Sequence, residues 1–140
     1  MSNPICFFDS NIFIYSVGRD HPLKVPSVAA IKKLRNADLL CVVSTEIIQE
    51  ILYRFQSIRQ LPLGISLAKD VMSISSRILS VTPEDTTLAM DLLESHPRIQ
   101  TRDAFHAATM INNHIKQIIS ADSHFDIIPG IKRIDPTHFT

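Results

Sequence analysis

The sequence is poor in glycine and cysteine, and each shortage excludes a class of site. Its three glycines, Gly18, Gly64 and Gly130, stand far apart, so the chain has no glycine-rich loop of the kind that cradles nucleotide phosphates. No serine has the flanking glycines of a nucleophile elbow, which argues against a Ser-His-Asp hydrolase. Its two cysteines, Cys6 and Cys41, are too few for a zinc site by themselves. Their apolar neighbours instead predict buried, reduced thiols.

The sequence also lacks a net charge and any long apolar segment. Lys and Arg number 14, as do Asp and Glu, so no overall positive charge attracts nucleic acid or anionic membranes. No apolar run reaches membrane-spanning length, and no basic leader precedes an apolar segment. We therefore expect a cytoplasmic protein with no membrane contact. Its length of 140 residues predicts one domain over residues 1–140.

Five short apolar runs predict the strands of a sheet. Segments with helical spacing separate these runs, which are Pro4–Phe8, Leu39–Val43, Ile78–Val81, Gln117–Ser120 and Ile131–Ile134. Strands that alternate with helices are typical of an α/β fold with a mainly parallel sheet that helices cover on both faces. The first two runs are almost wholly apolar, as central strands are. The last run is more polar and predicts an edge strand.

Acidic residues follow two of the predicted strands. Asp9 interrupts the apolar stretch FFDSNIFIY after the first strand, and Asp122 follows the fourth strand in ISADSHFD. Ligands of parallel α/β sheets bind beyond the carboxyl ends of the strands, so both acids lie where a site is expected. The alternatives are that Asp9 or its neighbour Ser10 caps the next helix, and that Asp122 is a turn residue.

Two further acids belong to predicted helices. The helix after the second strand has one apolar face, made of Ile47, Ile48, Ile51, Leu52, Phe55 and Ile58. We place Glu50 at the edge of this face, toward the site, and Glu46 nearly opposite, where it interacts with the helix dipole. An ion pair of Glu50 with Arg54 is the alternative. Asp103 opens an alanine-rich helix, again with the helix dipole as the alternative.

Four acids thus converge on one end of the predicted sheet: Asp9, Glu50, Asp103 and Asp122. Carboxylates that lie close together repel each other and raise one another's pKa values, so such a cluster predicts a bound cation. Oxygen ligands suit Mg²⁺ or Mn²⁺. No set of histidines and cysteines accompanies the acids in the sequence, which disfavours zinc.

Four segments in this order, FFDSNIFIY, STEIIQEILYRF, TRDAFHAA and ISADSHFDIIPGI, resemble the PIN-domain ribonucleases, and among them the VapC-type toxins of prokaryotic toxin–antitoxin pairs. The resemblance spans nearly the whole chain. It implies a three-layer α/β/α fold with a five-stranded sheet in the order 3-2-1-4-5. It also implies Mg²⁺- or Mn²⁺-dependent cleavage of RNA phosphodiester bonds, usually by a homodimer, and a cognate antitoxin that blocks the site.

The resemblance matches the four acids of the family to Asp9, Glu50, Asp103 and Asp122. It implies that Asp9, Asp103 and Asp122 are the metal ligands and that Glu50 positions water or a second ion.

The resemblance further implies that Ser10 and Asn11 orient a carboxylate or a phosphate oxygen, and that Asp126 is an auxiliary acid. The candidates for contact with RNA are the basic residues Arg54, Arg98, Arg102 and Lys116, and for each of them solvated surface charge is the favoured alternative. One alternative stays open, namely a non-catalytic binding module whose acids hold a metal ion or a protein partner. A phosphatase of the haloacid dehalogenase type is disfavoured, because Asn11 stands where that family needs a second aspartate.

Overall fold

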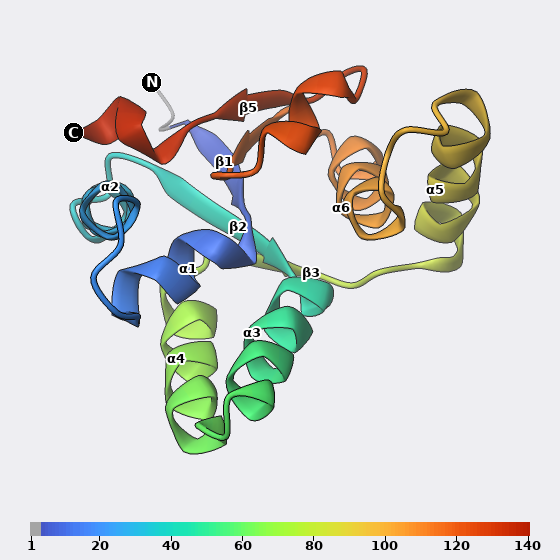
Figure 1. Ribbon diagram of the computed structural model, residues 1–140. Coiled ribbons are helices and arrows are strands. Elements are labelled where there is room, and N and C mark those ends of the chain that lie inside the picture. The colour runs from blue at the N-terminus through green and yellow to red at the C-terminus, as the bar shows by residue number, and fades with distance from the viewer. Residues whose placement is uncertain (1–3) are drawn as a thin grey trace.

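The computed structural model of the protein describes residues 4–140. Five parallel strands form one sheet in the order β3-β2-β1-β4-β5 (Figure 1). The strands are β1 (Ile5–Phe8), β2 (Leu40–Ser44), β3 (Arg77–Leu79), β4 (Gln117–Ile119) and β5 (Lys132–Ile134). Each strand overlaps the apolar run that predicted it, and the predicted order is confirmed. The predicted domain includes residues 1–3, which lie outside the described residues.

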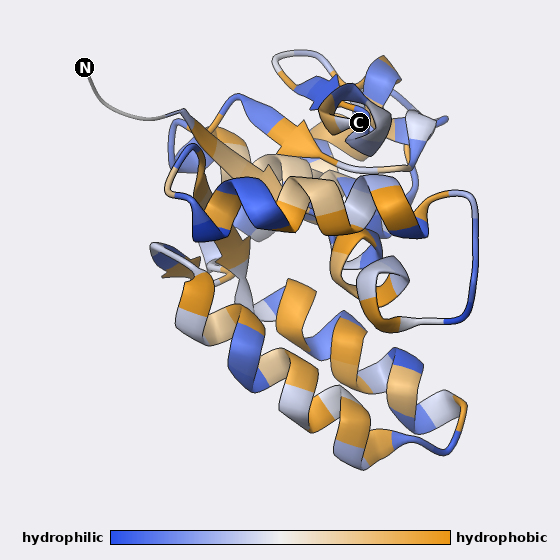
Figure 2. Cartoon of the chain, turned by 90° about the vertical axis from the view of Figure 1, so that its left-hand side faces the viewer, coloured by the Kyte–Doolittle hydropathy of each residue, from blue (hydrophilic) through white to orange (hydrophobic). Residues whose placement is uncertain are grey.

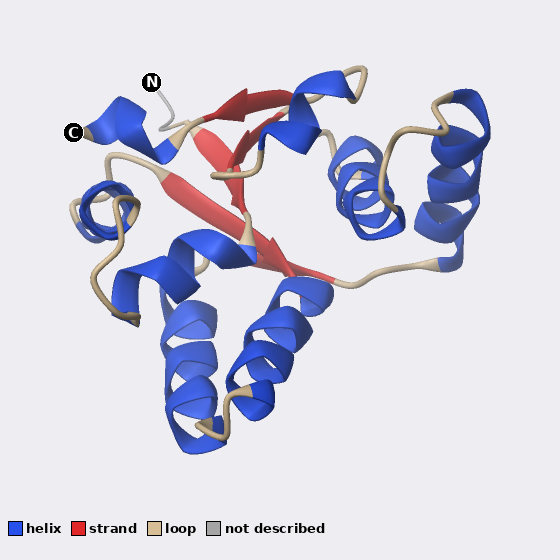
Figure 3. Ribbon diagram, in the orientation of Figure 1, coloured by secondary structure: helices blue, strands red, loops and turns tan. Residues whose placement is uncertain are grey.

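Helices cover both faces of this sheet (Figure 3). The chain runs outward from β1 to β2 and β3, and then returns through β4 to β5. Because crossovers between parallel strands are right-handed, helices before β3 and helices after it cover opposite faces. The first set is α1 (Ser10–Val17), α2 (Lys24–Arg35), α3 (Thr45–Ser57) and α4 (Leu61–Ile74), and the second is α5 (Pro83–Ser95) and α6 (Thr101–Asn112). The three-layer prediction is therefore confirmed, and the strand order reverses between β1 and β4.

Side-chain caps start α3 and α5. The Ser44 hydroxyl at the end of β2 accepts a hydrogen bond from the Ile47 amide (3.3 Å), which starts α3. Thr82 and Asp85 form a capping box at the start of α5, as their residue types favour. The buried Asp85 carboxylate also accepts hydrogen bonds from Thr109 (3.1 Å) and Asn112 (2.8 Å). These bonds tie α5 to α6, the helix that carries Asp103.

The core lies around the central strands. Phe7 and Phe8 of β1 are fully buried, as expected for a strand covered on both faces. Cys6 and Cys41 are buried and free, as predicted. Burial raises the pKa of the Cys6 thiol to about 11 and that of Cys41 to about 12. No helix in residues 4–140 is both long and apolar enough to cross a membrane.

The helices α3 and α4 form an antiparallel pair that projects from the sheet (Figure 1). The sequence around Leu61 and Gly64 predicts a loop, but it is the first turn of α4, with Pro62 in that turn. A Cβ at Gly64 would lie 2.5 Å from the Phe55 Cβ, so only glycine permits this close approach of the helices. Figure 2 shows these helices striped in hydrophobic and hydrophilic colours, as amphipathic helices are.

Candidate active site

Asp9 links the end of β1 to the start of α1. Its Oδ1 accepts a hydrogen bond from the Ser10 amide (2.8 Å) as the cap of α1. Its Oδ2 accepts hydrogen bonds from the Ser120 hydroxyl (2.6 Å) and the Asn11 amide nitrogen (3.2 Å). Burial raises the pKa of this carboxyl, although the positive charge of His106 and the bond from Ser120 partly oppose the rise. The capping alternative is therefore correct for Asp9, and the same carboxylate also lies in the acid cluster.

Ser120 joins the two strand ends at the reversal. It is fully buried and immediately follows β4, the strand that pairs with β1 through Phe8 and Ile119. Its hydroxyl donates to Asp9 and accepts a hydrogen bond from the Asp122 amide (3.0 Å). One serine therefore fixes the backbone of Asp122 relative to the carboxylate of Asp9.

Asp122 begins the short 3-10 helix η1 (Ser123–Ile127). Its Oδ1 accepts a hydrogen bond from the His124 amide (2.9 Å) and lies 3.0 Å from the His124 ring Nδ1. Asp122 is therefore also a turn residue, as the alternative stated, because its side chain caps the start of η1. Its side chain stays partly exposed, at 27%, so a ligand can reach it.

Asp103 lies in the first turn of α6 and is 2% exposed. Its Oδ2 has no hydrogen-bond partner among the described residues. Burial raises the pKa of this carboxyl to about 6, and the nearby charges of Asp122 and Asp9 add to the rise. A buried carboxylate oxygen without a donor is costly, and a bound cation would remove that cost. The site therefore fits a divalent cation.

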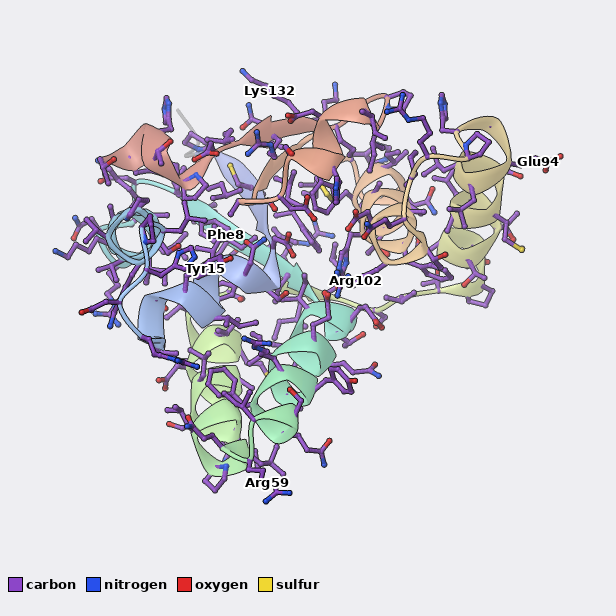
Figure 4. The ribbon with its side chains drawn as sticks, viewed as in Figure 1. Phe8, Tyr15, Arg59, Glu94, Arg102 and Lys132 are labelled. Atoms are coloured by element: carbon purple, nitrogen blue, oxygen red, sulfur yellow. The ribbon has the colours of Figure 1, made fainter. Side chains whose placement is uncertain are left out.

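Glu50 on α3 is held by two residues of α6. The Nε2 of His106 lies 2.6 Å from Oε1, and the Nε of Arg102 lies 3.3 Å from Oε2. The predicted alternative partner of Glu50, Arg54, is not the one that it contacts. Arg102 lies beside the N-terminal end of α3 (Figure 4).

His106 is almost fully buried, and its ring lies near the rings of Phe7 (5.8 Å between centroids) and Phe125 (6.5 Å). Burial lowers the pKa of His106, but the hydrogen bond to Glu50 and the neighbouring carboxylates outweigh it, so its pKa is raised overall.

Two groups of possible metal ligands result. Asp9, Glu50 and His106 each offer a ligand atom within 4.8 Å of the others, and Asp103, Asp122 and His124 do the same. The charge of Asp9 also acts on Asp103, so the groups are neighbours and all four predicted acids meet in one region. Each group includes a histidine, which the sequence did not predict. The sequence argued against zinc because no histidines were expected beside the acids, and this argument no longer holds.

The predicted position of Glu46 is wrong. Glu46 and Glu50 line the same cavity of about 390 Å³, together with Ser10 and Arg102. Residues four apart on a helix point in directions only about 40° apart, so they share a face. Glu46 therefore lies beside the site.

Asp126 faces a different partner. Its exposed carboxylate pairs with Arg133 (2.8 Å), and this hydrogen bond lowers its pKa. Arg133 also donates to the Ser120 carbonyl (3.1 Å) and to Asp135 (3.0 Å). Asp126 is thus connected to the acid cluster only through Arg133 and then Ser120, and its auxiliary role stays a prediction.

The predicted site lacked Ser120, His106 and His124, and it missed the contact of Arg102 with Glu50. Ser120 could be found as the polar residue at the end of a strand, two positions before Asp122. His106 stands three positions after Asp103, which places both on one helix face. The fold alone reveals that this face meets Glu50.

Comparisons with known proteins identify the same fold. Residues 6–131 match the family model of the PIN domain. Ribonuclease VapC13 of Mycobacterium tuberculosis is 32% identical over 127 residues, which cover 90% of this chain and 96% of that protein. Ribonuclease VapC23 of the same species is 31% identical over 121 residues, which cover 83% of this chain and 91% of its own.

Two solved structures show the likeness in three dimensions. VapBC2 from Rickettsia felis, bound to a DNA fragment from its promoter, has a TM-score of 0.74 at 16% identity and covers 94% of this chain and 98% of its own. VapC20 of M. tuberculosis, a toxin that cleaves the sarcin-ricin loop, has a TM-score of 0.68 at 14% identity and covers 91% and 98%. At these identities the structures establish the fold, and the sequence matches establish the family. The chain therefore belongs to the PIN domain family, in which its curated relatives are VapC ribonucleases.

Proposed function

We propose that this chain is a ribonuclease of the VapC type that cleaves RNA phosphodiester bonds with a bound Mg²⁺ or Mn²⁺, as the toxin of a type II toxin–antitoxin pair. The observation that carries the proposal is the meeting of Asp9, Glu50, Asp103 and Asp122. All four lie inside the matched PIN region, and four separate elements supply them.

Asp9, Asp103 and Asp122 would hold the cation, and the free Oδ2 of Asp103 supports this assignment. When bound, such an ion lowers the pKa of a water molecule and stabilises the charge that develops on the phosphate oxygens. The residues around the acids keep the carboxylates in place. Ser120 and Asn11 fix Asp9 by hydrogen bonds, as groups behind metal ligands commonly do.

Glu50 would position the attacking water. Its carboxylate is held from both sides by His106 and Arg102, so its orientation is set before substrate arrives. The Arg102 side chain is 59% exposed, which leaves guanidinium donors free to meet a phosphate of the substrate.

The partners belong to the same proposal. The matching structures include toxin–antitoxin complexes, and we infer that an antitoxin binds this chain too. Exposed Val17, Ile58 and Leu63 line a second cavity of about 590 Å³ beside the first, and a protein partner could cover such an apolar surface. A homodimer and a cytoplasmic location complete the proposal.

Cleavage of labelled RNA by the purified protein tests the proposal. We expect cleavage with Mg²⁺ or Mn²⁺, none in EDTA, and a loss of at least about a hundredfold in Asp122→Asn, since removal of one group that stabilises the transition state commonly costs that much. The matched control is Asp91→Asn on α5, whose side chain is exposed. Full activity in EDTA would refute the metal mechanism. Metal binding without cleavage of any RNA would favour the binding module.

A further inference from the structure

One face of α3 forms a polar wall beside the acids. Glu46, Gln49, Tyr53, Arg54 and Ser57 all line the cavity of about 390 Å³ that also contains Glu50. Glu46, Gln49, Tyr53 and Ser57 follow one another at three or four residues, and Arg54 stands four residues after Glu50, so together they form one broad face of the helix. At about 1.5 Å per residue this face is roughly 16 Å long, which leaves room for a base and the nucleotide next to it. The opposite face of α3, with Ile47, Ile51 and Phe55, is buried.

Tyr53 is the aromatic residue of this wall. Its exposed fraction is 71%, and it stands one helical turn after Glu50. In the described chain it has no ring contact or hydrogen bond, unlike Tyr15, which stacks on His21 (4.5 Å between ring centroids). An exposed ring beside a phosphodiester-cleaving centre is a platform on which a base can stack.

Glu46 is the acid of this wall without a partner. Glu50 is engaged by Arg102 and His106, whereas within residues 4–140 no hydrogen bond or ion pair involves the Glu46 side chain. A free carboxylate repels phosphate and accepts hydrogen bonds from N–H groups. The cavity is lined by two acidic residues, Glu46 and Glu50, and by two basic residues, Arg54 and Arg102. Their charges balance, so the cavity has no excess positive charge. This balance suits a base better than a phosphate.

We propose that this wall is a nucleobase subsite with a preference for guanine, an inference that rests on the proposed ribonuclease function. The base next to the scissile phosphate stacks on Tyr53, and Glu46 accepts hydrogen bonds from its Watson–Crick edge. Gln49 lies between the two and offers an amide donor and acceptor to the same edge. Guanine presents two adjacent donors on that edge, N1–H and the N2 amino group, which match the two oxygens of a carboxylate. Other bases present at most one such group there.

Short RNAs that differ only at one base beside the cut test the subsite, through kcat and KM with Mg²⁺. The wild-type protein should prefer guanine at this position. Glu46→Gln should lower kcat/KM for the guanine RNA, and with it the guanine preference, by about fivefold or more, because a good two-bond contact to a base contributes about 1–3 kcal/mol; kcat/KM for the other RNAs should change less. Glu94→Gln is the matched control, since this exposed side chain lies on α5, away from α3 (Figure 4).

Tyr53 has its own pair of variants. Tyr53→Ala should weaken RNA binding roughly five- to hundredfold, the range for loss of one stacked base, whereas Tyr53→Phe should retain it. This loss should appear mainly in KM. Thermal melts should show unchanged folding, since the side chain is exposed.

The outcomes separate the two proposals. If the wild-type protein cleaves no RNA, the proposed function fails, and binding of the same RNAs still tests the wall. If cleavage is robust but neither Glu46→Gln nor Tyr53→Ala changes base preference or affinity, the subsite is refuted and the ribonuclease stands. If the Glu46→Gln and Tyr53→Ala variants lose binding to a purified antitoxin but still bind RNA as the wild-type protein does, the wall belongs to a protein partner, and the subsite is overturned.

Discussion

Replacing Asp103 by asparagine should stabilise the metal-free protein at neutral pH. The carboxyl is 2% exposed, one of its oxygens has no partner, and burial together with Asp122 and Asp9 raises its pKa to about 6. The substitution removes a charge with little change of shape. The new amide can also donate to the neighbouring carboxylates, which the original group cannot do once ionised.

The magnitude follows from proton linkage. The ordinary pKa of an aspartate is about 3.9, so between about pH 4 and pH 6 the folded state binds more protons at Asp103 than the unfolded state does. Stability therefore falls as pH rises through this window. Two pKa units correspond to at most about 3 kcal/mol, and relaxation of the protein around the buried charge reduces this to about 2 kcal/mol. For a chain of this size, Asp103→Asn should then raise Tm by roughly 6 °C at pH 7.5 and by little at pH 4.

Thermal melts in EDTA at fixed ionic strength, at several pH values, measure this difference. Asp91→Asn is the control for a change of net charge at an exposed site. Added Mg²⁺ should stabilise the unmutated protein by about 2.7 kcal/mol at a hundred times its dissociation constant, and Asp103→Asn much less. A lower Tm for Asp103→Asn at pH 7.5, or a difference that does not change with pH, would refute the crowded-carboxylate reasoning.

Two further predictions concern residues around the acids. Glu50→Gln should lower kcat for RNA by at least about tenfold while Glu46→Gln keeps it, and equal losses in both would contradict the separate roles given to them. Arg133→Met should lower the free energy of unfolding by about 1–3 kcal/mol, because Arg133 bonds the Ser120 carbonyl, Asp126 and Asp135. Urea unfolding measures this loss, and an unchanged stability would show that the network contributes nothing.

Much of the fold was predictable because its signals are local. Apolar runs mark strands, and Ser44 and Thr82 start helices through caps that the sequence displays. Asp9 and Asp122 each follow a predicted strand, and the rule that sites lie at the carboxyl ends of parallel strands placed both residues in the site. The strand order, which makes β1 and β4 neighbours, came from the resemblance to a family.

The contacts between the acids and their neighbours were not predictable in the same way. His106 meets Glu50 across 56 positions of sequence, and Ser120 meets Asp9 across 111. No local pattern reports on such pairs, because they depend on how helices pack on the sheet. The error at Glu46 had another origin, since the 3.6-residue period of a helix already places it beside Glu50.

Asp9 shows why a structural role and a site role do not exclude each other. A buried carboxylate is tolerated only where donors compensate it, and here the donors are the Ser10 amide, the Ser120 hydroxyl and the Asn11 side chain. In Asp9→Asn one accepting oxygen becomes an NH₂ group, which faces a donor in either orientation: the Ser10 amide at the Oδ1 position, or the Asn11 side chain at the Oδ2 position. This variant should therefore lose stability as well as cleavage. Melts in EDTA that show a higher Tm for Asp9→Asn would contradict this view. Loss of activity at Asp9 therefore cannot separate folding from chemistry, whereas Asp103, with a free oxygen, can.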